Sequence, residues 1–343
     1  MKAHYLPLLT AIGIASLVVG SNAQAPQAKG SPAPYKAPRN AFGQPDLEGT
    51  WTNNSLTPLQ RPAAWANKTT LTPDEVEMLK QATAKLEESG DALFGDELVI
   101  DTIEGKGKAT SRDTETGNYN GFWLPARDVD NRTSLIIDPP DGRLPPTTPE
   151  SQARQRAAAE QRALHPADAP ESRGLGERCI TFGVPRLTAA YSSVFEVAQS
   201  PDTFVFTMET IHDARVIPLG NVPPLPKMMP QWLGNSRGHW EGDTLVVETR
   251  GFSQKTSMMG ATGGLTLVER FTRIAPDVLQ VDSTLTDPAT WTKPWTARLL
   301  LRKTSEPLIE YACHEGNHGL AGILSGARKQ EAAEAAAKRG STK

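Results

Sequence analysis

The sequence predicts a mainly β protein, in which an antiparallel meander closes into a barrel or a strongly curved sheet with two or three peripheral helices. From residue 190 onward, apolar and polar residues alternate with period two, which is typical of half-buried strands. Turn signals recur at Ser200-Pro201-Asp202, Glu241-Gly242-Asp243 and Ala275-Pro276-Asp277. No helix-length pattern separates the strands, as a parallel sheet would require. Because so many strands otherwise leave unpaired edges, we expect closure.

The N-terminus has the pattern of a secretory signal peptide. Lys2 precedes an apolar run from Leu6 to Gly20, and small residues follow at Ser21 and Ala23. The run is shorter than the roughly 20 residues that span a bilayer, so cleavage after residue 23 is favoured over an uncleaved anchor. A formal charge of -3 offers no basic field for nucleic acid. The sequence therefore predicts a periplasmic or secreted protein without stable membrane insertion.

The rest of the chain divides by composition. Residues 24–44 are rich in Pro, Ala, Gln and Lys, which predicts a flexible linker. Residues 45–327 are expected to form a single β-rich domain, and residues 328–343 a polar C-terminal tail. Thr72-Pro73 and Thr148-Pro149 each place an N-cap before a proline at the first helical position. These starts predict helices near 73–88 and 148–164.

Strands are expected where alternation is clearest. The predicted strands are 132–138, 193–198, 204–209, 245–249, 265–274, 279–285, 296–302 and 308–313. The run 209–215 is expected to continue its strand, which would put His212 on the face of Phe204, Phe206 and Met208.

Two resemblances support this outline. Gly49-Thr50-Trp51 resembles the Gly-x-Trp entry strand of lipocalin-like barrels, which implies a Trp plug near an Arg from a late strand, here Arg298 or Arg302. A second likeness is carried by residues 47–51 (LEGTW), 134–143 (SLIIDPPDGR), 178–186 (RCITFGVPR) and 311–317 (YACHEGN). Through these segments the whole chain after the signal resembles a group of uncharacterised exported bacterial proteins. The likeness implies export and a shared fold and assigns no catalytic residue.

The two cysteines, Cys179 and Cys313, would meet an oxidising compartment after export. An even number of exported cysteines favours one disulfide that closes a long loop. Two buried thiols, or a metal site that joins Cys313 to His314 and His318, are the alternatives.

The densest polar group runs from Tyr311 to His318. His314 and Glu315 are candidate acid-base residues here, and His314 with His318 is a candidate pair of ligands for a divalent metal, completed by His212 or His239. His212 ends an apolar stripe and is a second candidate base. Each histidine has an equally simple structural role as a hydrogen-bonding residue.

Further candidates surround these histidines. A Cys179–Cys313 bridge would bring Arg178 close to His314 as a fixed cation for an anionic group. Glu269 is a carboxylate on an apolar strand face, where Arg273 could neutralise it. The candidate substrate-binding residues are Trp232, Trp291, Trp295, Tyr311 and Glu269.

Two classes of function follow. The first is an exported small-molecule enzyme of the lyase, isomerase or hydrolase type, with His212, His314 and Glu315 as acid-base residues and Arg178 holding an anion. The second is a lipocalin-like carrier for an apolar or sugar-like ligand. The sequence has no phosphate loop, Rossmann fingerprint or nucleophile elbow, so we expect no nucleotide-derived cofactor.

Overall fold

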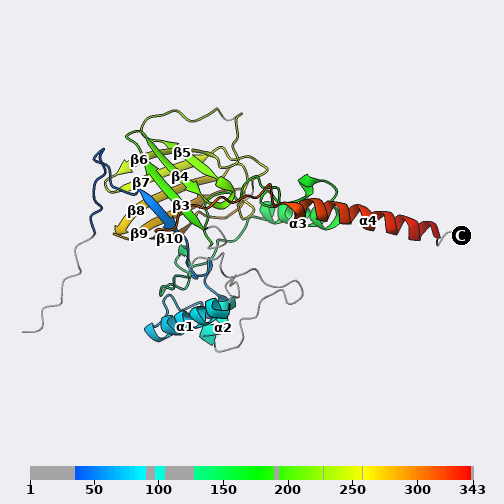
Figure 1. Ribbon diagram of the computed structural model, residues 1–343, viewed down its shortest axis with the longest axis horizontal. Coiled ribbons are helices and arrows are strands. Elements are labelled where there is room, and N and C mark those ends of the chain that lie inside the picture. Colours follow the sequence, from blue (N-terminus) through cyan, green and yellow to red (C-terminus); the bar gives the residue numbers. More distant parts are fainter. Residues whose placement is uncertain are drawn as a thin grey trace, which may run out of the picture. The chain divides into compact units, whose positions relative to one another are not determined.

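One antiparallel sheet dominates the protein (Figure 1). The computed structural model describes residues 35–89, 97–104, 127–188, 193–226, 228–256 and 258–340, so the predicted signal peptide and residues 24–34 lie outside the described residues. The strands are β1 (Gly49–Thr52), β2 (Ile136–Asp138), β3 (Val194–Gln199), β4 (Thr203–Met208), β5 (Ala214–Pro218), β6 (Asn235–Glu241), β7 (Thr244–Arg250), β8 (Thr266–Ala275), β9 (Val278–Thr286) and β10 (Trp295–Lys303). Their order is β5-β4-β3-β1-β10-β9-β8-β7-β6, with β2 beside β10.

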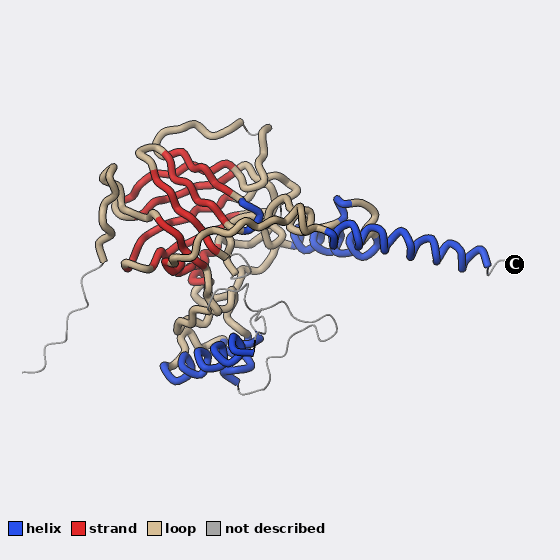
Figure 2. Tube along the Cα trace, viewed as in Figure 1, coloured by secondary structure: helices blue, strands red, loops and turns tan. Residues whose placement is uncertain are grey.

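The two ends of this row come together, so the sheet forms a nearly closed barrel (Figure 2). Leu219, directly after β5, bridges Gly238 in β6, and the Gly220 amide donates to the Gly238 carbonyl at 2.9 Å. A Cβ at Gly238 would lie 2.7 Å from the Leu219 side chain, and glycine therefore permits this close approach. The predicted fold class is confirmed.

The three predicted turns connect β3 to β4, β6 to β7, and β8 to β9. The strands next to these turns agree closely with the predicted ranges, apart from β6, where the sequence predicts no strand. Period-two burial runs along β8, β9 and β10, with one face packed into the barrel. The interior is built largely of Leu, Val, Phe and Trp side chains.

Three strand predictions are wrong. In the predicted strand 132–138, residues 136–138 alone form β2. Residues 308–313 form no strand. They follow β10, which already pairs with a strand on each side, so no edge of β10 is left for them to pair with, and Pro307 interrupts the chain between β10 and this segment. Residues 209–215 reverse direction in a 3-10 turn, Thr210–His212, so His212 does not share the face of Phe204.

The helices start where the caps predict. In α1 (Pro73–Ser89), Thr72 and Glu75 exchange hydrogen bonds as a capping box, and in α3 (Pro149–Leu164) the Thr148 hydroxyl accepts from the Ser151 amide at 3.0 Å. The short α2 (Glu97–Glu104) contributes Val99 to a second small core with α1. The long α4 (His318–Gly340) runs through the predicted tail boundary at 328.

One end of the barrel is closed around Trp51, which is fully buried. Two cations lie over the Trp51 ring, Arg273 and Lys303, each 5.8 Å from the ring centre. Arg298 and Arg302, the residues expected there, instead pair with Asp282 and Asp128. The prediction of Arg298 or Arg302 is wrong because both face outward on β10, whereas Arg273 alternates inward on β8.

The chain entering β1 is also fixed at this end. Arg39 pairs with Asp243 at 2.5 Å, and Ala37 is buried. Within the described residues, no helix combines the length and apolar character needed to cross a membrane.

Candidate functional site

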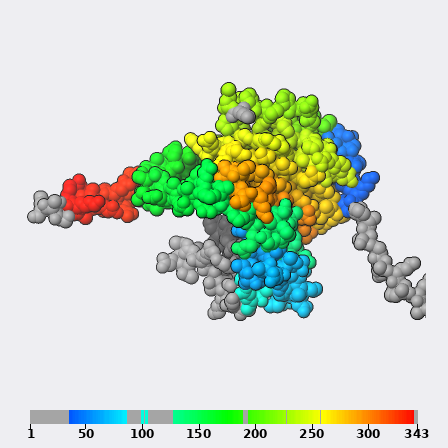
Figure 3. All heavy atoms as spheres, turned by 180° about the vertical axis from the view of Figure 1, so that it is seen from behind, coloured from blue at the N-terminus to red at the C-terminus, as the bar shows by residue number. Residues whose placement is uncertain are grey.

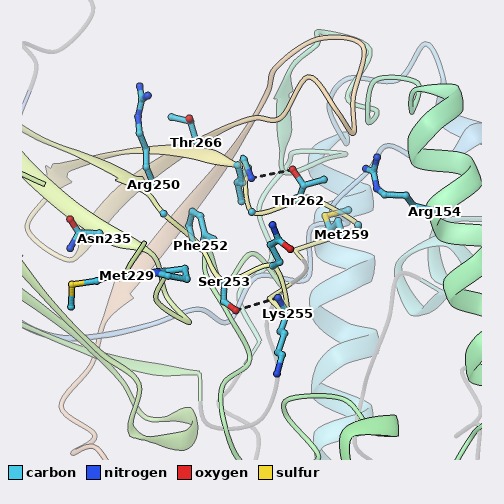
Figure 4. A pocket seen from close by; sticks show the side chains of 18 of the residues that line it. Arg154, Met229, Asn235, Arg250, Phe252, Ser253, Lys255, Met259, Thr262 and Thr266 are labelled. Carbon is cyan, nitrogen blue, oxygen red and sulfur yellow. Dashed lines mark hydrogen bonds between the residues drawn. The ribbon is translucent and has the colours of Figure 1, made fainter. Parts of the chain in front are cut away.

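A large cavity lies at the other end of the barrel, where α3 faces the loops that follow β5 and β7. Its volume is about 1660 Å³. Figure 4 shows Arg154 reaching from α3, with Arg250 and Phe252 on the strand side and Met259 and Thr262 between them. From behind, the surface of α3 meets the yellow and orange surface of the later strands and loops (Figure 3).

The charges along this cavity have one sign. Its cations are Arg154, Arg162, Arg250 and Lys255, and no described residue that lines it is an aspartate or a glutamate. Arg154 donates to the Ala289 carbonyl, and Arg250 pairs with Glu248. Arg162 and Lys255 form no side-chain hydrogen bond or ion pair with another described residue. An anion in the cavity would therefore find two uncompensated cations.

The same cavity has an apolar wall. Phe252 is buried beneath it, and Met229 and Met259 line it together with Pro224, Pro226 and Pro230. Thioether and aromatic side chains accept apolar ligands of variable shape. The combined lining suits a molecule with an acidic group and an apolar body.

Asp287 fixes the glycine-rich loop that forms one side of the cavity. Its carboxylate accepts hydrogen bonds from the Thr262 amide at 2.6 Å and the Thr290 hydroxyl at 2.7 Å. Burial alone would raise the pKa of the Asp287 carboxyl, but these hydrogen bonds outweigh it and lower the pKa. The loop is thereby held against the end of β9.

A smaller cavity, of about 640 Å³, adjoins the larger one and shares Arg162 and Lys255 with it. It extends over residues 171–176 and is also lined by Arg178, whose Nη2 lies 3.6 Å from Oε1 of Glu171. Phe182 contributes a partly exposed ring.

The predicted disulfide between Cys179 and Cys313 is confirmed, with a Cα–Cα distance of 5.7 Å. It joins the segment at the smaller cavity to the chain before α4. The Asn317 side chain strengthens this junction by donating to the Glu177 carbonyl at 2.8 Å.

The turn between β4 and β5 contains two carboxyl groups removed from solvent, Glu209, which is buried, and Asp213, which is half-buried. Burial raises the pKa of both Glu209 and Asp213. Asp213 accepts from the Thr181 hydroxyl at 2.7 Å, and Glu209 accepts from the Ile309 amide. Ile211 and His212 both have left-handed backbones, with φ of 58° and 55°, which is strained for non-glycine residues.

The structure does not bring the predicted acid-base residues into either cavity. His212 ends the strained turn, and His314 and Glu315 lie in the turn before α4; all three are exposed. His318 is the exposed first residue of α4. Among the described residues, no group of three or more His, Cys, Asp or Glu side chains is placed to hold a metal ion. Arg178 is the predicted catalytic residue that does line a cavity.

The predicted substrate-binding residues are also dispersed. Trp291 and Trp295 are buried and meet edge to face, with ring centres 5.5 Å apart. Trp232 lies on the loop after β5, partly exposed, and its carbonyl accepts from Thr256. Tyr311 is half-buried near the disulfide.

Glu269 lies inside the barrel. Its Oε2 is 2.6 Å from Nη2 of Arg215, and both side chains are almost fully buried. Arg215 also donates to the hydroxyls of Ser236 and Thr249. The expectation that Arg273 neutralises Glu269 is wrong, because Arg273 lies at the Trp51 end, where it contacts Asp46.

Sequence reasoning missed the cations of the larger cavity. Arg154 and Arg162 lie in the helix predicted near 148–164 with no functional signal of their own, and Arg250 and Lys255 fall between the predicted strands 245–249 and 265–274. The available signal was the length and glycine content of the stretch from Gly251 to Leu265 between two strands, since long ordered loops in compact domains are often functional.

Comparison of the chain with protein-family models, with curated proteins and with solved structures finds no match.

Proposed function

We propose that the protein binds a small amphiphilic acid in the cavity between α3 and the loop of residues 251–265. The observation that carries this proposal is the lining, which combines four cations, an apolar wall and no carboxylate among its described residues. An acidic group would compensate Arg162 and Lys255, and an apolar body would cover Phe252 and Met259.

We infer that this binding takes place outside the cytoplasm, in the periplasm or after secretion. The inference is supported by the signal-peptide pattern of residues 1–23 and by the Cys179–Cys313 disulfide, since such bonds persist in oxidising compartments. The role is that of a carrier, as in the lipocalin-like alternative, with an acidic ligand in place of a neutral one.

Isothermal titration with decanoate and its neutral counterpart 1-decanol tests the proposal. We expect decanoate to bind about tenfold more tightly, because a charge-assisted hydrogen bond contributes about 1.5–3 kcal/mol. Its affinity should fall as salt is added. Arg162→Ala and Lys255→Ala should each weaken decanoate binding about fivefold, because an exposed charge pair contributes up to about 1 kcal/mol.

The matched control is Arg270→Ala, which removes an arginine that pairs with Glu241 away from both cavities. It should leave decanoate affinity unchanged. Equal affinity for decanoate and 1-decanol, or no binding of either, would overturn the proposal.

The catalytic hypothesis built on His212 and His314 stays a prediction, and the same titration separates it from binding. Because neither histidine lines the larger or the smaller cavity, a His212→Ala, His314→Ala double variant should bind decanoate like the wild type. Loss of binding in that variant, with an unchanged melting curve, would favour a site at the histidines.

A further inference from the structure

The two cavities meet at Arg162 and Lys255, and cations continue past this junction into the smaller cavity. We propose that the ligand carries two acidic groups joined by an apolar stretch, with the second group held by Arg178 in the smaller cavity. This inference rests on the proposed function of the larger cavity and specifies the class of ligand.

The arginines of the smaller cavity differ in what they already bind. Each guanidinium nitrogen of Arg173 already donates a hydrogen bond, two of them to the Glu177 carboxylate and the third to the Pro166 carbonyl. Within the described part of the chain, Arg178 forms one ion pair, with Glu171, at an N–O distance of 3.6 Å, which is longer than a hydrogen bond. Among the described residues, no acceptor is within hydrogen-bond reach of the Arg178 guanidinium.

Arg178 is also held in place. Its side chain is 21% exposed, its amide donates to the Gly174 carbonyl, and the next residue, Cys179, is tied to Cys313. A guanidinium on a fixed backbone loses less freedom when it binds a carboxylate, and it can bind through two parallel hydrogen bonds.

Glu171 acts as a weak internal competitor for the same guanidinium. Its side chain is 70% exposed, so it can turn into solvent when a ligand carboxylate replaces it. Removing its charge in Glu171→Gln should therefore increase the affinity for a second acidic group and leave the affinity for a single acid nearly unchanged.

The experiment compares α,ω-diacids, from octanedioate to hexadecanedioate, with the monoacid of the same length by isothermal titration. In the wild type, we expect the diacid of best-fitting length to bind about tenfold more tightly than its monoacid, from one additional charged hydrogen-bonding contact. Arg178→Ala should abolish this preference while monoacid affinity stays as in the wild type. Glu171→Gln should enlarge it, and Arg270→Ala should leave it unchanged.

The proposal is overturned if no diacid binds more tightly than its monoacid, or if the preference survives Arg178→Ala. Melting curves identify a misfolded Arg178→Ala variant, and in that case Glu171→Gln, which removes only a surface charge, decides by whether it enlarges the preference. Tight monoacid binding without a diacid preference would refute the second site and leave the proposed function standing. Absence of all binding would refute both.

Discussion

Glu269 and Arg215 form a buried ion pair inside a barrel built mainly from apolar side chains. Removing one member leaves the other charge uncompensated, which costs about 3–5 kcal/mol. We therefore expect Glu269→Ala to lower the free energy of unfolding by this amount in urea denaturation. The double variant Arg215→Met, Glu269→Leu should recover most of the loss. A cost below about 1 kcal/mol for Glu269→Ala would contradict the role of the pair.

At the same residue scale, alternation alone placed Glu269 on an inward face, but its partner could not be predicted. Arg273 lies on the same face of β8 and is the partner that alternation favours. The sequence gives no signal that Arg215, on β5, contacts Glu269 instead. The reason is that Arg215 reaches Glu269 only when the barrel closes, and closure depends on the approach of Leu219 to Gly238.

Among the elements, the loop that lines the larger cavity depends on Asp287. Because hydrogen bonds lower the pKa of this carboxyl in the folded state, its stabilising contribution is present above the ordinary value of 3.8 and is lost as the pH falls through the folded pKa. Asp287→Asn should cost about 1–3 kcal/mol at neutral pH and weaken decanoate binding. The difference from the wild type in urea denaturation should shrink below pH 3.8. A difference independent of pH would show that the charge of Asp287 is unimportant.

Elements with strong local signals were predictable. The strands around the three Pro/Gly-Asp turns, apart from the unpredicted β6, and the helices after Thr72 and Thr148 lie within one or two residues of their predicted bounds. The failures share a cause, since 209–215 and 308–313 alternate in sequence but their conformation is decided by tertiary contacts. The carboxyl groups of Glu209 and Asp213 accept hydrogen bonds from outside the 209–215 segment, and the Glu209–Ile309 hydrogen bond and the disulfide fix 308–313 as irregular chain.

For the whole molecule, the sequence supported a closed β-fold and one disulfide, but not the location of the cavity. The cavity forms where α3, the loop after β5 and the loop of residues 251–265 converge, and none of these segments has a distinctive motif. Histidines are conspicuous in a sequence because their ordinary pKa suits acid-base chemistry and their ring nitrogens bind metals. The three arginines and the lysine of the larger cavity indicate a binding site because the fold brings them to one surface whose described residues include no carboxylate.

The most direct test of the central claim is a crystal structure with bound 11-bromoundecanoate, in which anomalous scattering locates the bromine. We predict that the carboxylate lies against Arg162 and Lys255 and that the bromine lies among Phe252, Met229 and Met259. A bromine peak inside the barrel near Glu269, or at the exposed histidines, would contradict the account. So would crystals in which the ligand occupies no site between α3 and the loop of residues 251–265.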